Sequence, residues 1–82
     1  MKKYMTWEIS QNPVHVIGGD VECHPDPLTA TYVARCERLD VSAVGDTADE
    51  AFESLDEAVT MVLATLKERD LLGAFLAEVA QK

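Results

Sequence analysis

Basic residues are scarce in this chain of 82 residues. It has 7 lysine and arginine residues against 15 aspartate and glutamate residues, which gives a formal net charge of -8 at pH 7. Contacts with nucleic acid or an anionic membrane need lysine and arginine to neutralise phosphate groups. The composition therefore argues against direct partners of both kinds, and it favours solubility and attraction to basic proteins.

Long apolar runs are also missing. The N-terminal sequence MKKYMTWEIS begins with basic residues but lacks the apolar core of a signal peptide. No apolar run approaches the roughly 20 residues that a membrane helix needs. We therefore expect a cytoplasmic protein that does not bind a membrane.

Cysteine is rare, with only Cys23 and Cys36 in the chain. Two cysteines do not make a disulfide framework, and we expect both to stay reduced. Together with His15 and His24 they lack the spacing of a zinc finger, so we expect no metal and no cofactor. We expect Cys36 to be a small core residue in a strand and His24 to lie in a loop.

The chain length predicts a single domain over residues 1–82. Apolar residues make up 48% of the sequence, which argues against disorder. A chain this short buries only a little more than about 60% of its unfolded surface, so oligomerisation is a natural supplement to its stability.

Strand patterns fill the first half of the chain, at about residues 3–45. Residues 4–9 are rich in aromatic and β-branched side chains, and residues 11–13 indicate a turn. Alternation is clearest over residues 29–37, which we expect to pair antiparallel with residues 41–44.

The segment between these strands contains turn signals. Residues 14–17 form a short β-branched run, and Gly18-Gly19-Asp20 predicts a hairpin turn with residues 21–23 as the returning arm. Two prolines at residues 24–27 predict a loop, because proline removes a ladder donor.

Helix signals fill the second half. Thr47 and Glu50 form a T-x-x-E capping box just after Gly45. We expect a main helix over about residues 47–69 and a short C-terminal helix within about residues 71–81. The apolar stripe of the main helix comprises Ala51, Phe52, Leu55, Ala58, Val59, Val62, Leu63 and Leu66.

Strands followed by helices predict an α+β fold. We expect a small antiparallel sheet of three to five strands, packed by one long helix and followed by a short C-terminal helix.

The start of the main helix is strongly acidic. The sequence GDTADEAFESLDEA, at residues 45–58, holds six carboxylates and no lysine or arginine. The helix dipole favours the three acids nearest the helix start by about 0.3–1 kcal/mol each. Deeper acids repel each other four residues apart, as in Asp49–Glu53 and Glu53–Glu57. A merely solvated surface and a surface that binds a basic partner both remain open. The candidate partner-binding residues are Asp49, Glu53, Asp56 and Glu57.

Residues 29–66 resemble the N-terminal domain of the HicB family of antitoxins. That family has two strands, then Gly-Asp-Thr-x-x-Glu-Ala, and a helix with a later Glu-Ala. The sequence departs from the family at Glu37, where proline is common, and at Asp40, where glycine is common. The residues that fit the pattern are Tyr32, Cys36, Leu39, Gly45, Asp46, Thr47, Glu50, Ala51, Glu57 and Ala58.

The resemblance implies a partial ribonuclease H-like fold without nuclease activity, in the antitoxin half of a prokaryotic toxin–antitoxin pair. The toxin of such a pair is a small basic HicA-like protein that cleaves messenger RNA. An acidic antitoxin that covers the toxin's RNA-binding surface suits the charge of this chain. Family members form dimers or tetramers, so we expect a homo-oligomer. Complete HicB antitoxins often carry a DNA-binding domain, and residues 71–82 are too short for one.

Two other functions compete with this one. The first is a solo HicB-like domain that acts as a homo-oligomeric structural or regulatory protein without a toxin. Its interface would use Met5 and Trp7, which look exposed, with the C-terminal leucines. The second is an enzyme, which we do not expect. A two-metal nuclease needs converging carboxylates in strands, where Glu8 is alone, and His15 and His24 lack a nucleophile to activate.

Overall fold

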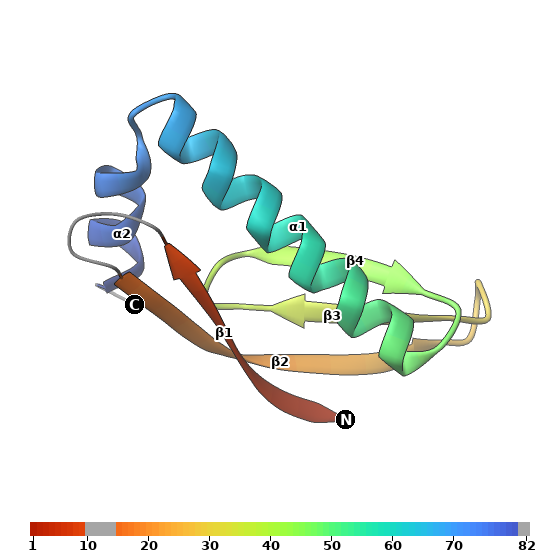
Figure 1. Ribbon diagram of the computed structural model, residues 1–82. Helices are drawn as coiled ribbons and strands as arrows, with labels where there is room; N and C mark the ends of the chain where they lie inside the picture. The colour runs from red at the N-terminus through yellow and green to blue at the C-terminus, as the bar shows by residue number, and fades with distance from the viewer. Residues whose placement is uncertain (10–14, 81–82) are drawn as a thin grey trace.

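The computed structural model describes residues 1–9 and 15–80, and it has the expected α+β fold. Four antiparallel strands lie in the order β1-β2-β3-β4, and the long helix α1 crosses one face of the sheet (Figure 1). The turn predicted at residues 11–13 lies outside the described residues. The elements are β1 (Lys2–Ile9), β2 (His15–Asp26), β3 (Thr31–Cys36), β4 (Val41–Gly45), α1 (Ala48–Glu68) and α2 (Leu72–Ala80).

A single core lies between α1 and the sheet. The predicted stripe is confirmed in most of its positions. α1 buries Ala51, Phe52, Leu55, Val59 and Leu63, and Ala58 and Leu66 are half-buried. The prediction is wrong at Val62, which is exposed. Alternate residues of the strands face this stripe, as the pleat requires. The buried sheet residues are Trp7, Ile9, Ile17, Val21, Cys23, Ala34 and Cys36. The opposite face of the sheet is not covered by any helix of the described residues and carries charged and polar side chains together with exposed Tyr4, Val16 and Val44, so the domain has two layers.

The hairpin predicted at Gly18-Gly19-Asp20 is wrong. β2 runs through these residues without a break, and Gly18 and Gly19 pair with Thr6 and Met5 of β1. The glycines mark close approaches instead. The ring of Tyr4 occupies the space that a Cβ on Gly18 would take, and a Cβ on Gly19 would lie 3.1 Å from the sulfur of Cys36. A glycine inside a strand often marks such a close approach by a neighbouring group.

The loop predicted at residues 24–27 is also wrong over most of its length. His24 and Pro25 belong to β2, where Pro25 pairs with Tyr32 of β3. β1 pairs with β2 only as far as Glu22 in the strand register, so β2 has a neighbour on one side at Pro25. A proline nitrogen that faces the open side removes no ladder bond.

The capping box at the start of α1 is confirmed. The hydroxyl of Thr47 accepts from the backbone N–H of Glu50 at 3.1 Å. The Glu50 carboxylate accepts from the N–H of Asp46 at 3.0 Å, one residue earlier than the usual return bond. These bonds fix the direction in which the acidic first half of α1 leaves β4.

The predicted C-terminal helix is confirmed as α2. The turn before it lies at Asp70, which is left-handed with φ of 57°. The N–H of Leu71 donates to the carbonyl of Leu66 at 2.8 Å, which closes a Schellman motif. α2 then folds back over the end of the sheet and buries Leu72 and Val79 (Figure 1).

Replacing Gly45 by alanine will destabilise the protein. The new Cβ would collide with backbone atoms of Glu50 and Ala51 in the first turn of α1, which cannot move aside. We expect Gly45→Ala to lower the free energy of unfolding by about 1–3 kcal/mol in urea titrations. Gly18→Ala is the control, because its Cβ meets only the mobile tip of exposed Tyr4. We expect that change to cost below about 0.5 kcal/mol. Equal losses would contradict this account.

Candidate functional site

Four of the six acids at the start of α1 share one hollow, and Asp49 and Asp56 do not line it. Asp46, Glu50, Glu53 and Glu57 line one shallow hollow, which we call the acidic hollow. Spacings of three and four residues place them on the same side of a helix. The other lining residues come from β3, β4 and the helix itself: Thr31, Val44, Gly45 and Ser54.

Every titratable side chain in the acidic hollow is a carboxylate. Glu50 is engaged with the backbone N–H of Asp46. Glu53 and Glu57 are exposed and make no hydrogen bond or ion pair within the described part of the chain. Their neighbours at helical spacing are acids, which costs helix stability. Glu53 and Glu57, like the exposed Asp49, therefore remain available to an external cation.

Asp56 does not line the acidic hollow and already has a partner. Its carboxylate accepts from the indole nitrogen of Trp7 at 2.7 Å. Trp7 was expected to be exposed, and this is wrong, because its side chain is only 5% exposed. Lys3 of the same strand lies with its ammonium 5.4 Å from the centre of the Phe52 ring. These contacts attach β1 to α1.

Asp49 occupies the first turn of α1 and is exposed. It does not line the acidic hollow. The acidic hollow thus includes Glu53 and Glu57 and leaves out Asp49 and Asp56. The residues of the family motif hold the start of the helix. Gly45 admits the first turn of α1, Thr47 and Glu50 cap it, Ala51 is buried and Ala58 is half-buried.

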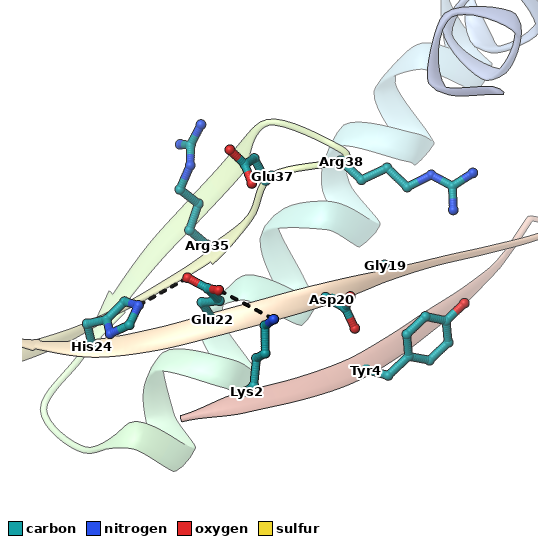
Figure 2. Close-up of a pocket in the computed structure, with 9 residues that line it drawn as sticks. All are labelled: Lys2, Tyr4, Gly19, Asp20, Glu22, His24, Arg35, Glu37 and Arg38. Carbon is teal, nitrogen blue, oxygen red and sulfur yellow. Dashed lines mark hydrogen bonds and ion pairs between the residues drawn. The ribbon is translucent and has the colours of Figure 1, made fainter. Parts of the chain in front are cut away.

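A second hollow lies on the open face of the sheet (Figure 2). Glu22 stands between Lys2 and His24, at 3.7 Å and 3.2 Å. The hydrogen bond with His24 is the main cause that lowers the pKa of the Glu22 carboxyl, and the charge of Lys2 adds to it. Sequence reasoning missed this group because it placed His24 in a loop.

The remaining cations of this second hollow also have partners. Arg35 donates to Asp40 at 3.0 Å, and Arg38 donates to the carbonyl of Gly18 at 3.0 Å. Acids and bases alternate over the surface, which also includes Asp20 and Glu37. Because its charges are of both signs and largely satisfied by one another, this face offers less to a charged ligand than the acidic hollow does.

The described residues contain no group of three or more His, Cys, Asp or Glu side chains placed to hold a metal ion. Cys23 and Cys36 are buried free thiols, and Cys36 lies in a core strand as expected. Within residues 1–9 and 15–80, no helix has the length and hydropathy to span a membrane.

No family model, curated protein or solved structure matches this chain. A functional proposal therefore rests on the chain's own residues and on the sequence resemblance described above.

Replacing Asp56 will reveal its structural role. We expect Asp56→Ala to lower the free energy of unfolding by about 1–3 kcal/mol, because it leaves the buried indole N–H of Trp7 without an acceptor. Glu53→Ala is the matched control on the same helix. We expect it to stay within about 0.5 kcal/mol of the parent chain, because it removes an exposed charge among like charges. Urea unfolding followed by circular dichroism measures both. A neutral Asp56→Ala would refute the role assigned to the Trp7 bond.

Proposed function

We propose that this chain is a HicB-like antitoxin, a binding module that neutralises a small basic toxin by covering its RNA-binding surface. The observation that carries the proposal is the acidic hollow, where Glu53 and Glu57 stand beside Asp46 and Glu50 without any basic neighbour. The sequence resemblance over residues 29–66 supplies the class of partner. In this proposal the protein acts in the cytoplasm, where the toxin cleaves messenger RNA.

The arrangement of the acids suits a protein that competes with RNA for the toxin's binding surface. An RNA-binding surface presents lysine and arginine to a row of phosphates. From Glu50 to Glu57 the carboxylates form a row of negative charge along α1, over roughly 10 Å at 1.5 Å per residue. Such a row attracts the same cations and raises the rate of encounter with a basic protein.

The acids also have energy to gain from a cation. In the isolated chain they repel one another, at about 0.2–0.5 kcal/mol for each like-charged pair at helical spacing. A basic partner converts this repulsion into attraction. The backbone of β4 borders the same hollow through Val44 and Gly45.

The alternative is a solo HicB-like domain that works as a homo-oligomer without a toxin. The interface predicted for this alternative is wrong at Trp7 and Leu72, because both side chains are buried within the domain. Leu71 remains exposed at the turn into α2. The observation that favours this alternative is the open outer edge of β1 in the strand order.

A charge-matched pair of variants tests the antitoxin proposal. The tagged protein is used to retain proteins from the native host lysate at low salt and at high salt. We expect a small basic ribonuclease near stoichiometric amounts at low salt and its release at high salt, because exposed charges are screened over about 8 Å at physiological ionic strength. We expect Glu53→Gln/Glu57→Gln to lose this partner and to stop inhibiting its cleavage of messenger RNA.

The control is Glu68→Gln/Glu78→Gln, which removes two exposed acids outside the acidic hollow. It changes the net charge by the same amount, so we expect it to retain the toxin. Recovery of the protein alone, or equal retention by both double variants, would contradict the proposal.

A further inference from the structure

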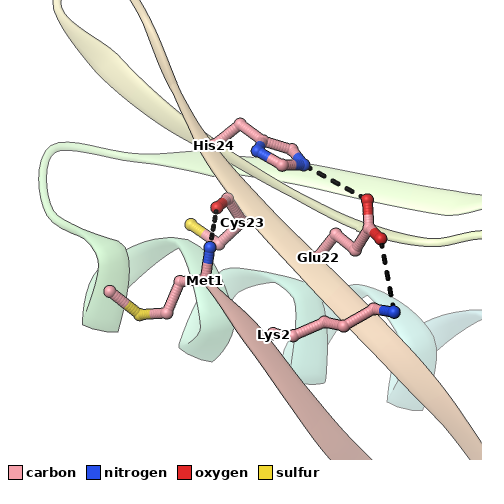
Figure 3. A network of polar contacts seen from close by, with 5 residues as sticks. All are labelled: Met1, Lys2, Glu22, Cys23 and His24. Atoms are coloured by element: carbon pink, nitrogen blue, oxygen red, sulfur yellow. Dashed lines mark hydrogen bonds and ion pairs between the residues drawn. The ribbon is translucent and has the colours of Figure 1, made fainter.

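β1 is an edge strand, and its hydrogen bonds to β2 fix the direction in which its backbone groups point. The amino group of Met1 donates to the carbonyl of Cys23 at 3.0 Å (Figure 3). The N–H of Cys23 donates back to the carbonyl of Met1 at 2.8 Å. Two residues that exchange both bonds form a hydrogen-bonded pair, and such pairs alternate along an antiparallel ladder. Odd-numbered residues of β1 therefore face β2 with their backbone groups.

Even-numbered residues of β1 face the other way. The N–H and C=O groups of Lys2, Tyr4, Thr6 and Glu8 point away from β2, toward a side on which no strand pairs within the described residues. An edge of this length is a template for pairing with another chain. α1 does not close it, because a groove remains between β1 and α1. The groove is lined by Thr6, Trp7, Glu8, Ile9, Thr60, Leu63, Ala64 and Lys67.

We propose that a second copy of this chain pairs antiparallel with β1 along this edge, with Met5 of each copy opposite Met5 of the other. A two-fold axis perpendicular to the sheet makes the interface self-complementary. It pairs Tyr4 with Thr6 and Lys2 with Glu8, each twice. All four outward-facing residues of both copies then exchange backbone hydrogen bonds.

The charges of β1 favour this register. Lys2, whose ammonium lies 3.7 Å from Glu22 of its own chain, comes opposite Glu8 of the second copy on the open face of the sheet, so it would be shared between the two carboxylates. Within a single chain, Glu8 has Val16 as its ladder neighbour and no ion pair among the described residues. Opposite charges across a ladder stabilise it, and like charges destabilise it. A register shifted by two residues places Tyr4 opposite Glu8 or leaves Glu8 beyond the paired segment.

The side chains of β1 on the helix side of the sheet also complement those of the second copy. In the proposed register, Lys3 comes opposite Trp7 of the second copy, whose indole is bonded to Asp56. The two lysines at the start of one strand therefore approach the acids near the end of the other. The paired sheet would have its helices on one face, and both acidic hollows would stay open because they lie next to β4. This proposal does not depend on the antitoxin function.

A cysteine at the axis tests the proposal on the full chain. Met5 would form a non-hydrogen-bonded pair with itself, where Cα atoms lie about 4.5 Å apart. That distance lies within the roughly 4.4–6.8 Å that a disulfide requires. We expect Met5→Cys to form a covalent dimer under mild oxidation, seen on a non-reducing gel.

Two controls accompany this variant. The parent chain should stay monomeric on the same gel, because Cys23 and Cys36 are buried. Thr6→Cys introduces an exposed thiol one residue away, opposite Tyr4 of the second copy, and should link far less. Absence of the Met5→Cys dimer would overturn the proposal, and so would equal or faster linking by Thr6→Cys, which indicates another register or random collision.

A charge exchange is the second arm and needs no new thiol. Sedimentation equilibrium measures the dimer dissociation constant, and circular dichroism confirms the fold of each variant. We expect Lys2→Glu and Glu8→Lys each to weaken the dimer roughly 2- to 30-fold, because each variant places like charges opposite at two symmetric sites. The double variant restores opposite charges and should recover the dimer. A double variant no tighter than the single variants would overturn the Lys2–Glu8 pairing.

Discussion

The fold depends on the burial of one helical stripe against one face of a four-stranded sheet. Leu55 and Val59 of α1 and Val21 of β2 are almost fully buried at the centre of this contact. No helix of the described residues covers the other face, which is largely polar and carries ion pairs such as Lys2–Glu22 and Arg35–Asp40. The polar side of α1 faces solvent for the same reason. The two-layer architecture explains why polar residues lie on this surface, but it does not explain why so many of them are acids.

One acidic run on α1 serves two functions. Glu53 and Asp56 are both acids and lie only three residues apart. Glu53 lines the acidic hollow, whereas Asp56 accepts a hydrogen bond from the indole of Trp7. A mutation that removes the whole run would mix a surface effect with a loss of packing. The surface argument must therefore be tested on Glu53 and Glu57, which carry charge without a structural bond.

Local signals were sufficient for much of the fold. The capping box at Thr47, the apolar stripe of α1 and the alternation in β3 depend on residues close together in sequence, and all are confirmed. The errors arise where a residue far away in the sequence determines the local structure. Gly18 lies in a strand because it pairs with Thr6 of β1, and Pro25 is tolerated because β1 does not extend far enough to pair with it. In the candidate site, helical spacing grouped Asp49 with Glu53 and Glu57, but it could not show that Asp49 does not line the hollow or that Trp7 bonds to Asp56.

The two proposed surfaces lie at opposite edges of the sheet and rest on different forces. Pairing along β1 would be held mainly by backbone hydrogen bonds, which form when the two strands are in register. Salt screens these bonds only weakly. Binding at the acidic hollow would be held mainly by exposed charges, which salt screens strongly. Pairing two chains brings two acidic hollows onto one particle and doubles its negative charge. This would strengthen attraction to a basic partner without any new contact, since local concentration rises when two sites are linked. A chain of this size gains stability from such an assembly, because its single core is small.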